Sequence, residues 1–244
     1  MSEPPTLGRQ GPGGTAPGRV VVVATPIGNL GDLSPRAVAA LAGAGYVYCE
    51  DTRRTLALLT HSGIAGPCLV SHHVHNEAAS TASALRRLKE GAVIALVTDA
   101  GTPAVSDPGA RLVREALAAG AQVEVVPGPS AVLAALAVSG LATERWCFEG
   151  FLPRTGRRRA DRLAAVAGEE RAVVLFESPH RLQRSLDDLL SACGPGRPVA
   201  MCRELTKLHE EVWRGTVGEI AERARAVKPR GEYTLVLGPA ARES

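Results

Sequence analysis

Short runs of apolar residues alternate with amphipathic stretches along nearly the whole of the 244-residue chain. Apolar runs of about four to eight residues bounded by Gly, Pro or Asp are typical of buried strands, and apolar positions three and four apart are typical of helices. The predicted strands are Val20–Ala24, Tyr46–Cys49, Cys68–Ser71, Val93–Thr98, Val123–Val126, Cys147–Gly150, Ala172–Phe176, Val199–Arg203, Glu211–Arg214 and Tyr233–Leu237. The predicted helices cover residues 34–43, 52–61, 76–90, 108–119, 130–139, 178–192 and 216–227.

This alternation predicts an α/β fold. The first half should be mostly parallel, whereas the two closely spaced strands at 199–214 favour antiparallel pairing. The Pro127-Gly128-Pro129 turn marks the expected boundary between an N-terminal α/β domain of residues 19–128 and a C-terminal α/β domain of residues 129–242. Residues 1–18 contain four Pro and five Gly with almost no apolar periodicity, and they are expected to form a disordered tail.

The composition narrows the class of protein. Hydrophobic residues make up 45% of the chain and charged residues 22%, which is typical of a soluble globular protein. The net charge of +3 is too small to indicate nucleic acid binding by itself, so any basic surface must be local. The five cysteines are widely spaced and form no CxxC pair, which favours reduced thiols. No apolar run approaches the roughly 18 to 20 residues that span a bilayer, so we expect a cytoplasmic protein without a membrane partner.

Three loops rich in Gly and Pro follow predicted strands, at the edge where open α/β sheets bind their ligands. Thr98–Gly109 far exceeds the roughly 2 to 6 residues usual for such a loop, and its polar composition favours a ligand site over a simple turn. Ala24–Leu30 is as consistent with a plain turn as with a ligand loop. In Pro127–Ser130, the serine can serve as a helix N-cap, with ligand contact as the second possibility.

Other polar segments allow both a chemical and a structural interpretation. Asp51, in Glu50–Thr55, can cap the next helix or face a ligand at the strand edge. Cys202–Lys207 places Arg, Glu, Thr and Lys at a strand end, as a substrate site or as an internal salt-bridge network. The three histidines between residues 72 and 75 match no common zinc spacing, so no metal is expected.

Five arginines fall within residues 154–162, shortly after Trp146, Phe148 and Phe151. Arginine clusters bind phosphates, and neighbouring aromatic rings can stack on bases. An ordinary solvated helix start that follows a strand with core aromatics explains the same pattern, so the cluster alone does not decide between the two.

Taken in order, eight segments resemble the ribosomal RNA small subunit methyltransferase I family, a branch of the tetrapyrrole methylase superfamily. They are ATPIGNLGD (24–32), CEDTRRT (49–55), VTDAGTPAVSDPG (97–109), PGPSA (127–131), FEGFLPR (148–154), FESPHR (176–181), RELTK (203–207) and GEYTLVLG (231–238). The TDAGTPAVSDPG segment alone indicates only the superfamily, whereas EDTRRT, HNE, FLPR and RELTK indicate the ribosomal RNA branch. The chain departs from its relatives at Ser71–Val74, where they more often carry an aromatic and an acidic residue.

The resemblance implies a two-domain tetrapyrrole-methylase-like fold with S-adenosylmethionine in the inter-domain cleft, and a homodimer. It implies 2′-O-methylation of a cytidine ribose in 16S ribosomal RNA, at the decoding centre of the small ribosomal subunit. The residues implied to line the cofactor site are Pro26, Asp99, Gly101, Thr102, Val105, Ser130 and Phe176.

Methyl transfer to a ribose hydroxyl needs alignment of the reacting atoms and help in removing a proton, but no metal. A cation that stabilises negative charge or a carboxylate that acts as a base would provide that help. The catalytic candidates are Lys207, Glu204, Asp51, Arg53 and Glu77. The candidates for RNA binding are Arg154, Arg157, Arg158, Arg159 and Arg203.

Two other functions stay open at this point. A methyltransferase that acts on a corrin or porphyrin precursor would share the Thr98–Gly109 loop, although the arginine cluster and RELTK favour RNA. A module that binds RNA without methylating it would not need an intact cofactor loop.

Overall fold

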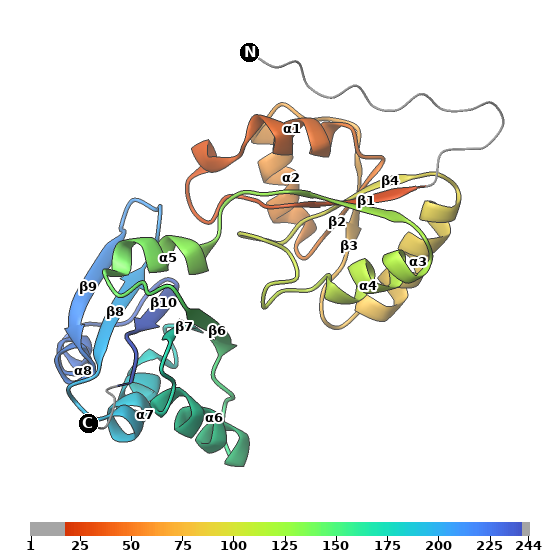
Figure 1. Ribbon diagram of the computed structural model, residues 1–244. Helices are drawn as coiled ribbons and strands as arrows, with labels where there is room; N and C mark the ends of the chain where they lie inside the picture. The colour runs from red at the N-terminus through yellow and green to blue at the C-terminus, as the bar shows by residue number, and fades with distance from the viewer. Residues whose placement is uncertain (1–17, 241–244) are drawn as a thin grey trace. The chain divides into compact units, whose positions relative to one another are not determined.

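The structure is a computed structural model that describes residues 18–240 (Figure 1). The expected disordered tail of residues 1–18 lies outside the described residues, apart from Gly18. The described chain divides into two compact units: unit 1 comprises residues 18–25 and 33–128, and unit 2 comprises residues 26–32 and 129–240. The segment Pro26–Asp32, which was expected in the N-terminal domain of residues 19–128, therefore belongs to unit 2.

Unit 1 is built on a parallel sheet with the strand order β3-β2-β4-β1-β5. The strands are β1 (Arg19–Val23), β2 (Tyr46–Cys49), β3 (Cys68–Ser71), β4 (Val93–Leu96) and β5 (Gln122–Val126). The helices of this unit are α1 (Pro35–Ala42), α2 (Thr52–His61), α3 (Glu77–Lys89) and α4 (Ala110–Ala118). The predicted α/β class and the parallel first half are both confirmed.

Helices bury both faces of this sheet. Side chains of a strand alternate between its two faces, so neighbouring residues of one strand enter different core clusters. Val21 and Val23 join a core cluster with Leu41 of α1 and Leu59 of α2. Val20, one residue before Val21, belongs to a separate cluster that contains Leu88 of α3 and Leu112 of α4. The near-continuous apolar run of β1 is thus explained by helices on both sides.

Unit 2 contains a mixed sheet with the order β6-β7-β10-β8-β9. Its strands are β6 (Trp146–Phe151), β7 (Ala172–Glu177), β8 (Pro198–Arg203), β9 (Glu211–Thr216) and β10 (Tyr233–Leu237). Only β6 and β7 pair in parallel, and the expected antiparallel pairing of β8 with β9 is confirmed.

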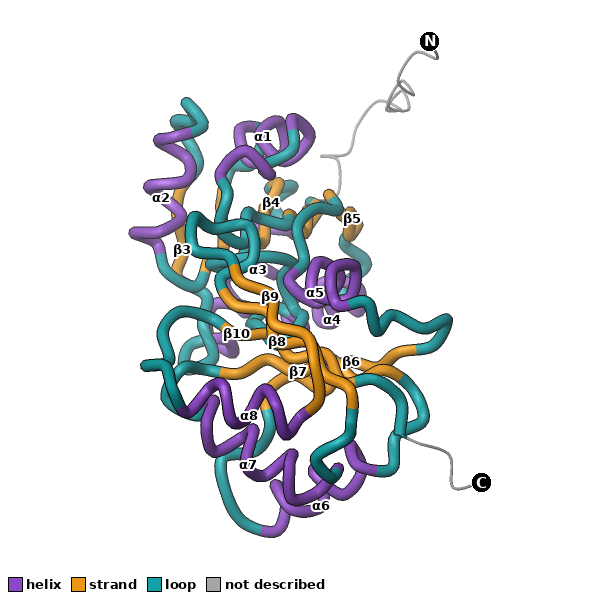
Figure 2. Tube along the Cα trace, turned by 90° about the vertical axis from the view of Figure 1, so that its left-hand side faces the viewer, coloured by secondary structure: helices purple, strands orange, loops and turns teal. Residues whose placement is uncertain are grey.

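The helices of unit 2 cover the two faces of its sheet. They are α5 (Ala131–Ser139), α6 (Arg157–Ala167), α7 (Leu182–Cys193) and α8 (Val217–Arg225). Helix α5 contacts β8, β9 and β10 on one face, and α6, α7 and α8 lie across the sheet from it (Figure 2). The main apolar core lies under these three helices and includes Val166, Leu186 and Ile220.

Most predicted helix starts are confirmed, and two are wrong. Ser34 caps α1, and Thr216 forms a capping box with Glu219 at the start of α8. Helix α7, however, begins at Leu182 after an Arg181 N-cap, so the Ser178-Pro179 pair precedes the helix without capping it. Helix α4 begins at Ala110 rather than residue 108, after Gly109 with φ +121°. Within residues 18–240, no helix is long and apolar enough to cross a membrane.

Candidate functional site

The loop that follows β4 in unit 1 has a strained backbone. Gly101, Ala104 and Ser106 have φ values of +83°, +67° and +63°. Such values are uncommon for residues with a Cβ, and they persist where surrounding structure enforces them, often at functional sites. The loop is fixed at one end by Thr25, whose backbone exchanges hydrogen bonds of 2.9 and 3.0 Å with Gly101. This geometry supports the interpretation of Thr98–Gly109 as a ligand loop.

Asp99 links this loop to the neighbouring strand end. Its Oδ1 accepts a hydrogen bond of 3.0 Å from the backbone N–H of Asp51, directly after β2. Its Oδ2 lies 3.4 Å from Nη1 of Arg54 in α2. Strands β2 and β4 are parallel neighbours, so their carboxyl ends meet at one edge of the sheet. The polar residues that follow both strands therefore lie together at this edge.

Asp51 and Arg53 form an ion pair at the start of α2. The Asp51 carboxylate accepts from the backbone N–H of Arg53 at 2.8 Å and from its Nη2 at 2.7 Å. These hydrogen bonds hold the pKa of Asp51 well below its usual range. A carboxylate with a lowered pKa is a weak proton acceptor, so the structure favours Asp51 as a helix cap over Asp51 as a general base.

Glu77, another catalytic candidate, is engaged in holding the ligand loop. Its Oε1 accepts a hydrogen bond of 3.1 Å from the backbone N–H of Gly109, which is the N-cap residue of α4. Glu77 is itself the first residue of α3. Its carboxylate therefore fixes the end of the Thr98–Gly109 loop to a neighbouring helix.

In unit 2, Lys207 lies between two carboxylates. Its Nζ is 2.9 Å from Oε1 of Glu204 and 2.9 Å from Oε2 of Glu232. Partial burial lowers the pKa of Lys207, but the hydrogen bonds to the two glutamates outweigh this and leave the pKa above its ordinary value. Burial raises the pKa of Glu204, but the Lys207 ammonium and the Glu232 backbone reverse the effect and leave it below its ordinary value. Lys207 is thus a fixed cation at neutral pH.

The turn that carries this lysine is strained and supported by a remote segment. Glu204 and Thr206 have φ values of +51° and +68°. Gly28, in the Pro26–Asp32 segment that belongs to unit 2, lies directly against the turn. A Cβ built on Gly28 would overlap the Cγ of Lys207 and lie 2.8 Å from Oγ1 of Thr206. The Pro26–Asp32 segment, which overlaps the possible ligand loop Ala24–Leu30, therefore also supports the RELTK turn.

Phe176, the aromatic cofactor candidate, belongs to a cluster of three rings on β6 and β7. Its centroid is 4.9 Å from that of Phe148 and 5.7 Å from that of Phe151. Phe151 is 50% exposed. Ser130 accepts a hydrogen bond of 3.5 Å from the N–H of Leu133, as expected of the α5 N-cap.

The arginine cluster is only partly a surface feature. Arg154, Arg157 and Arg158 are exposed. Arg159, however, is only 4% exposed, and its guanidinium bonds to Asp188, Ser185 and the Pro153 carbonyl. The prediction that Arg159 binds RNA is corrected on this ground, because its charge faces the interior. Arg203 also departs from the prediction, since its guanidinium bonds to Glu211 at 2.7 Å and to the Arg230 carbonyl at 3.0 Å.

The predicted site residues are therefore divided between the two units. Unit 1 holds Asp51, Arg53, Glu77, Asp99, Gly101, Thr102 and Val105. Unit 2 holds Pro26, Ser130, Phe176, Glu204, Lys207 and the arginines. Three further residues, Arg54, Glu50 and Glu232, were not among the predicted site residues. Glu50 has a raised pKa because burial and the nearby Asp99 disfavour its charge. Glu232 could have been found from the antiparallel pairing of β8 with β10, which sets it beside Glu204.

The side chain of His72 is buried in unit 1 and has a structural role. It is 1% exposed, and its Nδ1 lies 2.7 Å from Oγ of Ser80. Oγ of Ser80 also lies 3.0 Å from the Asn76 carbonyl oxygen and 3.2 Å from the Glu77 carbonyl oxygen. In the described part of the chain, no group of three or more His, Cys, Asp or Glu side chains is arranged to hold a metal ion.

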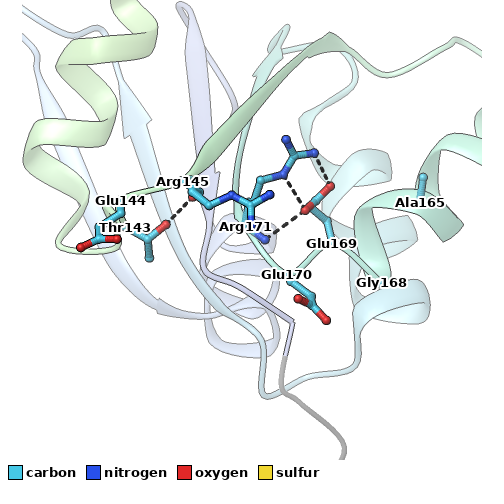
Figure 3. A pocket seen from close by; sticks show the side chains of 8 residues that line it. All are labelled: Thr143, Glu144, Arg145, Ala165, Gly168, Glu169, Glu170 and Arg171. Carbon is cyan, nitrogen blue, oxygen red and sulfur yellow. Dashed lines mark hydrogen bonds and ion pairs between the residues drawn. The ribbon is translucent and has the colours of Figure 1, made fainter.

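A surface hollow of about 780 Å³ also lies in unit 2 (Figure 3). Its lining residues are Thr143, Glu144, Arg145, Ala165, Gly168, Glu169, Glu170 and Arg171. Glu169 and Arg171 pair at 2.8 Å, and the hydrogen bonds from Arg171 lower the pKa of Glu169 to about 2. The residues that the sequence singled out for binding or catalysis do not include any of these eight.

Comparison with known proteins identifies a matching family and several relatives of this chain. The sequence model described as Tetrapyrrole (Corrin/Porphyrin) Methylases matches residues 19–221. Ribosomal RNA small subunit methyltransferase I of a Synechocystis strain is 46% identical over 226 residues, which cover 93% of this chain and 81% of that protein. The protein of the same name from Thermotoga maritima is 45% identical over 220 residues, covering 90% of this chain and 98% of the relative.

Solved structures with the same fold are more distant in sequence. The cobalt precorrin-4 methyltransferase CbiF superimposes with a TM-score of 0.69 at 21% identity, covering 91% of this chain and 94% of that one. Uroporphyrin-III C-methyl transferase from Thermus thermophilus, in complex with S-adenosyl homocysteine, gives a TM-score of 0.63 at 23% identity, covering 90% and 96%. At these identities, the superpositions show a shared fold.

Proposed function

The chain belongs to the tetrapyrrole methylase family, and within it to the ribosomal RNA small subunit methyltransferase I family, and we propose that it methylates the 2′-hydroxyl of a cytidine ribose in 16S ribosomal RNA at the decoding centre, using S-adenosylmethionine. The observation that carries the proposal is the 45–46% identity to relatives of that name over at least 90% of this chain. The substrate is the RNA within the small ribosomal subunit.

The residues present fit a cofactor with both polar and apolar parts. Ala104 and Ser106 are held at positive φ in the Thr98–Gly109 loop, on either side of Val105, which is 39% exposed. Phe176 offers a half-buried aromatic ring. When bound, S-adenosylmethionine supplies a methyl group activated by a sulfonium. The residues that would hold it are Pro26, Asp99, Gly101, Thr102, Val105, Ser130 and Phe176.

Lys207 would assist the ribose hydroxyl as a cation. The 2′-oxygen develops negative charge as its proton passes to solvent, and a preorganised ammonium stabilises that charge. The two flanking glutamates keep Lys207 protonated, which excludes it as a proton acceptor at neutral pH. They also orient the ammonium before substrate arrives, so no reorganisation is needed during the reaction.

The exposed Arg154, Arg157 and Arg158 would bind the RNA backbone. Arginine presents a planar set of donors that matches phosphate oxygens. The three lie at and just before the start of α6, after the exposed ring of Phe151. Phosphate contacts of this kind position a substrate without reading its sequence.

The decisive experiment maps methyl groups on 16S ribosomal RNA. Small subunits purified from cells that lack the protein are incubated with the purified protein and S-adenosylmethionine, and 2′-O-methyl positions are then mapped. We expect one cytidine at the decoding centre to gain the mark. Methylation of a base would overturn the 2′-hydroxyl assignment alone. Methylation of a corrin or porphyrin precursor, with none on RNA, would overturn the RNA substrate.

We also propose that the protein works in the cytoplasm as a homodimer, as the family resemblance implies. Sedimentation of the full chain measures the oligomeric state directly. A monomer at working concentrations would remove the homodimer from the proposal and leave the chemistry untouched.

A further inference from the structure

The segment between the exposed ring and the first exposed arginine is held by two other arginines. Leu152 and Pro153 separate Phe151 from Arg154. The Leu152 carbonyl accepts a hydrogen bond from Nη2 of Arg181, and the Pro153 carbonyl accepts one of 2.8 Å from Nη1 of Arg159. Two consecutive carbonyls are thus fixed by side chains that follow them by about 29 and 6 positions in the chain.

Arg159 uses its whole guanidinium inside the unit. Its side chain is 5% exposed, and its Nε and Nη2 both lie 2.7 Å from Oδ2 of Asp188. Nη2 also donates to Oγ of Ser185 at 3.0 Å. The planar guanidinium of Arg159 therefore donates hydrogen bonds to a carbonyl, a carboxylate and a hydroxyl at the same time. A lysine, with one ammonium, could keep the charge but not this geometry.

A buried carboxylate connects the two arginines. Glu177, whose side chain is 1% exposed, accepts from the Ser185 hydroxyl and lies 3.4 Å from Nε of Arg181. The backbone N–H of Ser178 donates to the same carboxylate at 2.8 Å. The chain of contacts runs from Arg159 through Ser185 and Glu177 to Arg181. Buried polar groups that are satisfied in this way fix one conformation.

We propose that Arg159 and Arg181 are positioning residues, which hold the Leu152-Pro153 backbone so that the Phe151 ring and the Arg154 guanidinium face ribosomal RNA at a fixed spacing. The inference rests on the proposed function. An aromatic ring stacks on an unpaired base, and a guanidinium beside it binds the adjoining phosphate. Ordering the backbone before binding reduces the conformational entropy lost on association. Arg159 acts through Phe151 and Arg154 and never contacts the RNA itself.

A double-mutant cycle tests this dependence. The variants are Arg159→Lys, Arg154→Ala and the two combined, each measured for affinity to the small ribosomal subunit. We expect each single change to weaken binding about fivefold to tenfold, and the combined loss to fall clearly short of the product of the two, because residues that act through one another are non-additive. Arg225→Lys is the matched control: Arg225 is a half-exposed, ion-paired arginine of α8, and its change should leave affinity within twofold.

Thermal melting of each variant separates positioning from folding. Should Arg159→Lys fail to fold, the same cycle with Arg181→Gln decides the matter, since Arg181 is 25% exposed and the Arg159 fork stays in place. Multiplicative losses in the double variant, or parent-like affinity in Arg159→Lys, would overturn the inference while leaving the RNA surface intact. An Arg154→Ala variant that binds like the parent would overturn the inference and the role of Arg154 together, whereas the methyl-mapping experiment would still stand.

Discussion

Gly28 lies against the side chain of Lys207, although the two are far apart in the sequence. A Cβ at Gly28 would overlap the Lys207 Cγ, and it would also lie 3.0 Å from the Leu205 carbonyl. The Pro26–Asp32 backbone therefore supports the aliphatic stem of the lysine, while Glu204 and Glu232 hold its ammonium. Only glycine allows this approach.

Replacing Gly28 with alanine should displace Lys207 and slow methyl transfer. Because misplacement of a catalytic group by about 1 Å can cost on the order of a hundredfold, we expect a single-turnover rate at least about tenfold lower. The cofactor dissociation constant, measured by calorimetry with S-adenosyl homocysteine, should change much less. Gly196→Ala is the control, since a Cβ there meets nothing within 4 Å. Equal rates for the two variants would remove the support role from Gly28.

Lys207→Ala should reduce the rate further, by about a hundredfold or more, as expected for loss of one electrostatic stabiliser. The pKa of Lys207 lies above its ordinary value of 10.5, so the parent rate should show no decline from deprotonation of this lysine up to that pH. Single-turnover rates from pH 6 to 10 measure both points. Lys228→Ala, at an exposed position of the same unit, is the control. A near-normal rate in Lys207→Ala would contradict the proposed chemistry.

The local pattern of the sequence was sufficient to predict most of the fold. Strands β2, β3 and β10 and helix α2 have the predicted bounds, because each combines a clear apolar pattern with a Gly, Asp or Pro boundary. Helix α6 was not predicted as an element, because its first turn consists of charged residues and the pattern was open to a surface cluster. Side-chain partners over long separations could not be predicted. The burial of Arg159 depends on Asp188 and Ser185 in α7, and nothing local to residue 159 indicates them.

Acid should destabilise unit 1 through His72. Burial lowers the pKa of this imidazole below its ordinary value of 6.5, despite the opposing effect of Glu77. The unfolded chain therefore binds the proton first, and the free energy of unfolding should fall as pH decreases below about 6.5, by at most about 1.4 kcal/mol per pH unit. Denaturant unfolding between pH 5 and 8 measures this slope. The dependence of the unfolding free energy on pH should be weaker in His72→Asn but unchanged in the exposed His75→Gln. Equal slopes in the two variants would assign the acid destabilisation to other groups.

The exposed arginines should make binding to the small ribosomal subunit depend on salt concentration. Each arginine that neutralises a phosphate releases counterions, so the logarithm of the binding constant falls with the logarithm of salt concentration in proportion to the number of contacts. Replacing Arg154, Arg157 and Arg158 with alanine should weaken binding to the small subunit and make this slope shallower by about two to three, at roughly 0.7 to 0.9 per phosphate. Affinity for S-adenosyl homocysteine should be unchanged, because none of the three is among the residues proposed to hold the cofactor.

The matched control for this triple variant removes equal charge from the same unit. Arg171, Arg184 and Arg225 are partly exposed arginines that pair with Glu169, Asp188 and Asp187. These three lie outside residues 154–158, so removing them should leave the salt slope close to that of the parent. Arg157 of the first triple also has a carboxylate nearby, with its Nε 3.7 Å from Oδ2 of Asp161. Binding to small subunits at several salt concentrations compares the three proteins. If both triple variants flatten the slope equally, the effect comes from net charge and the start of α6 is only a solvated face. If only the first does, then Arg154, Arg157 and Arg158 form the RNA-binding surface that the sequence suggested, without Arg159.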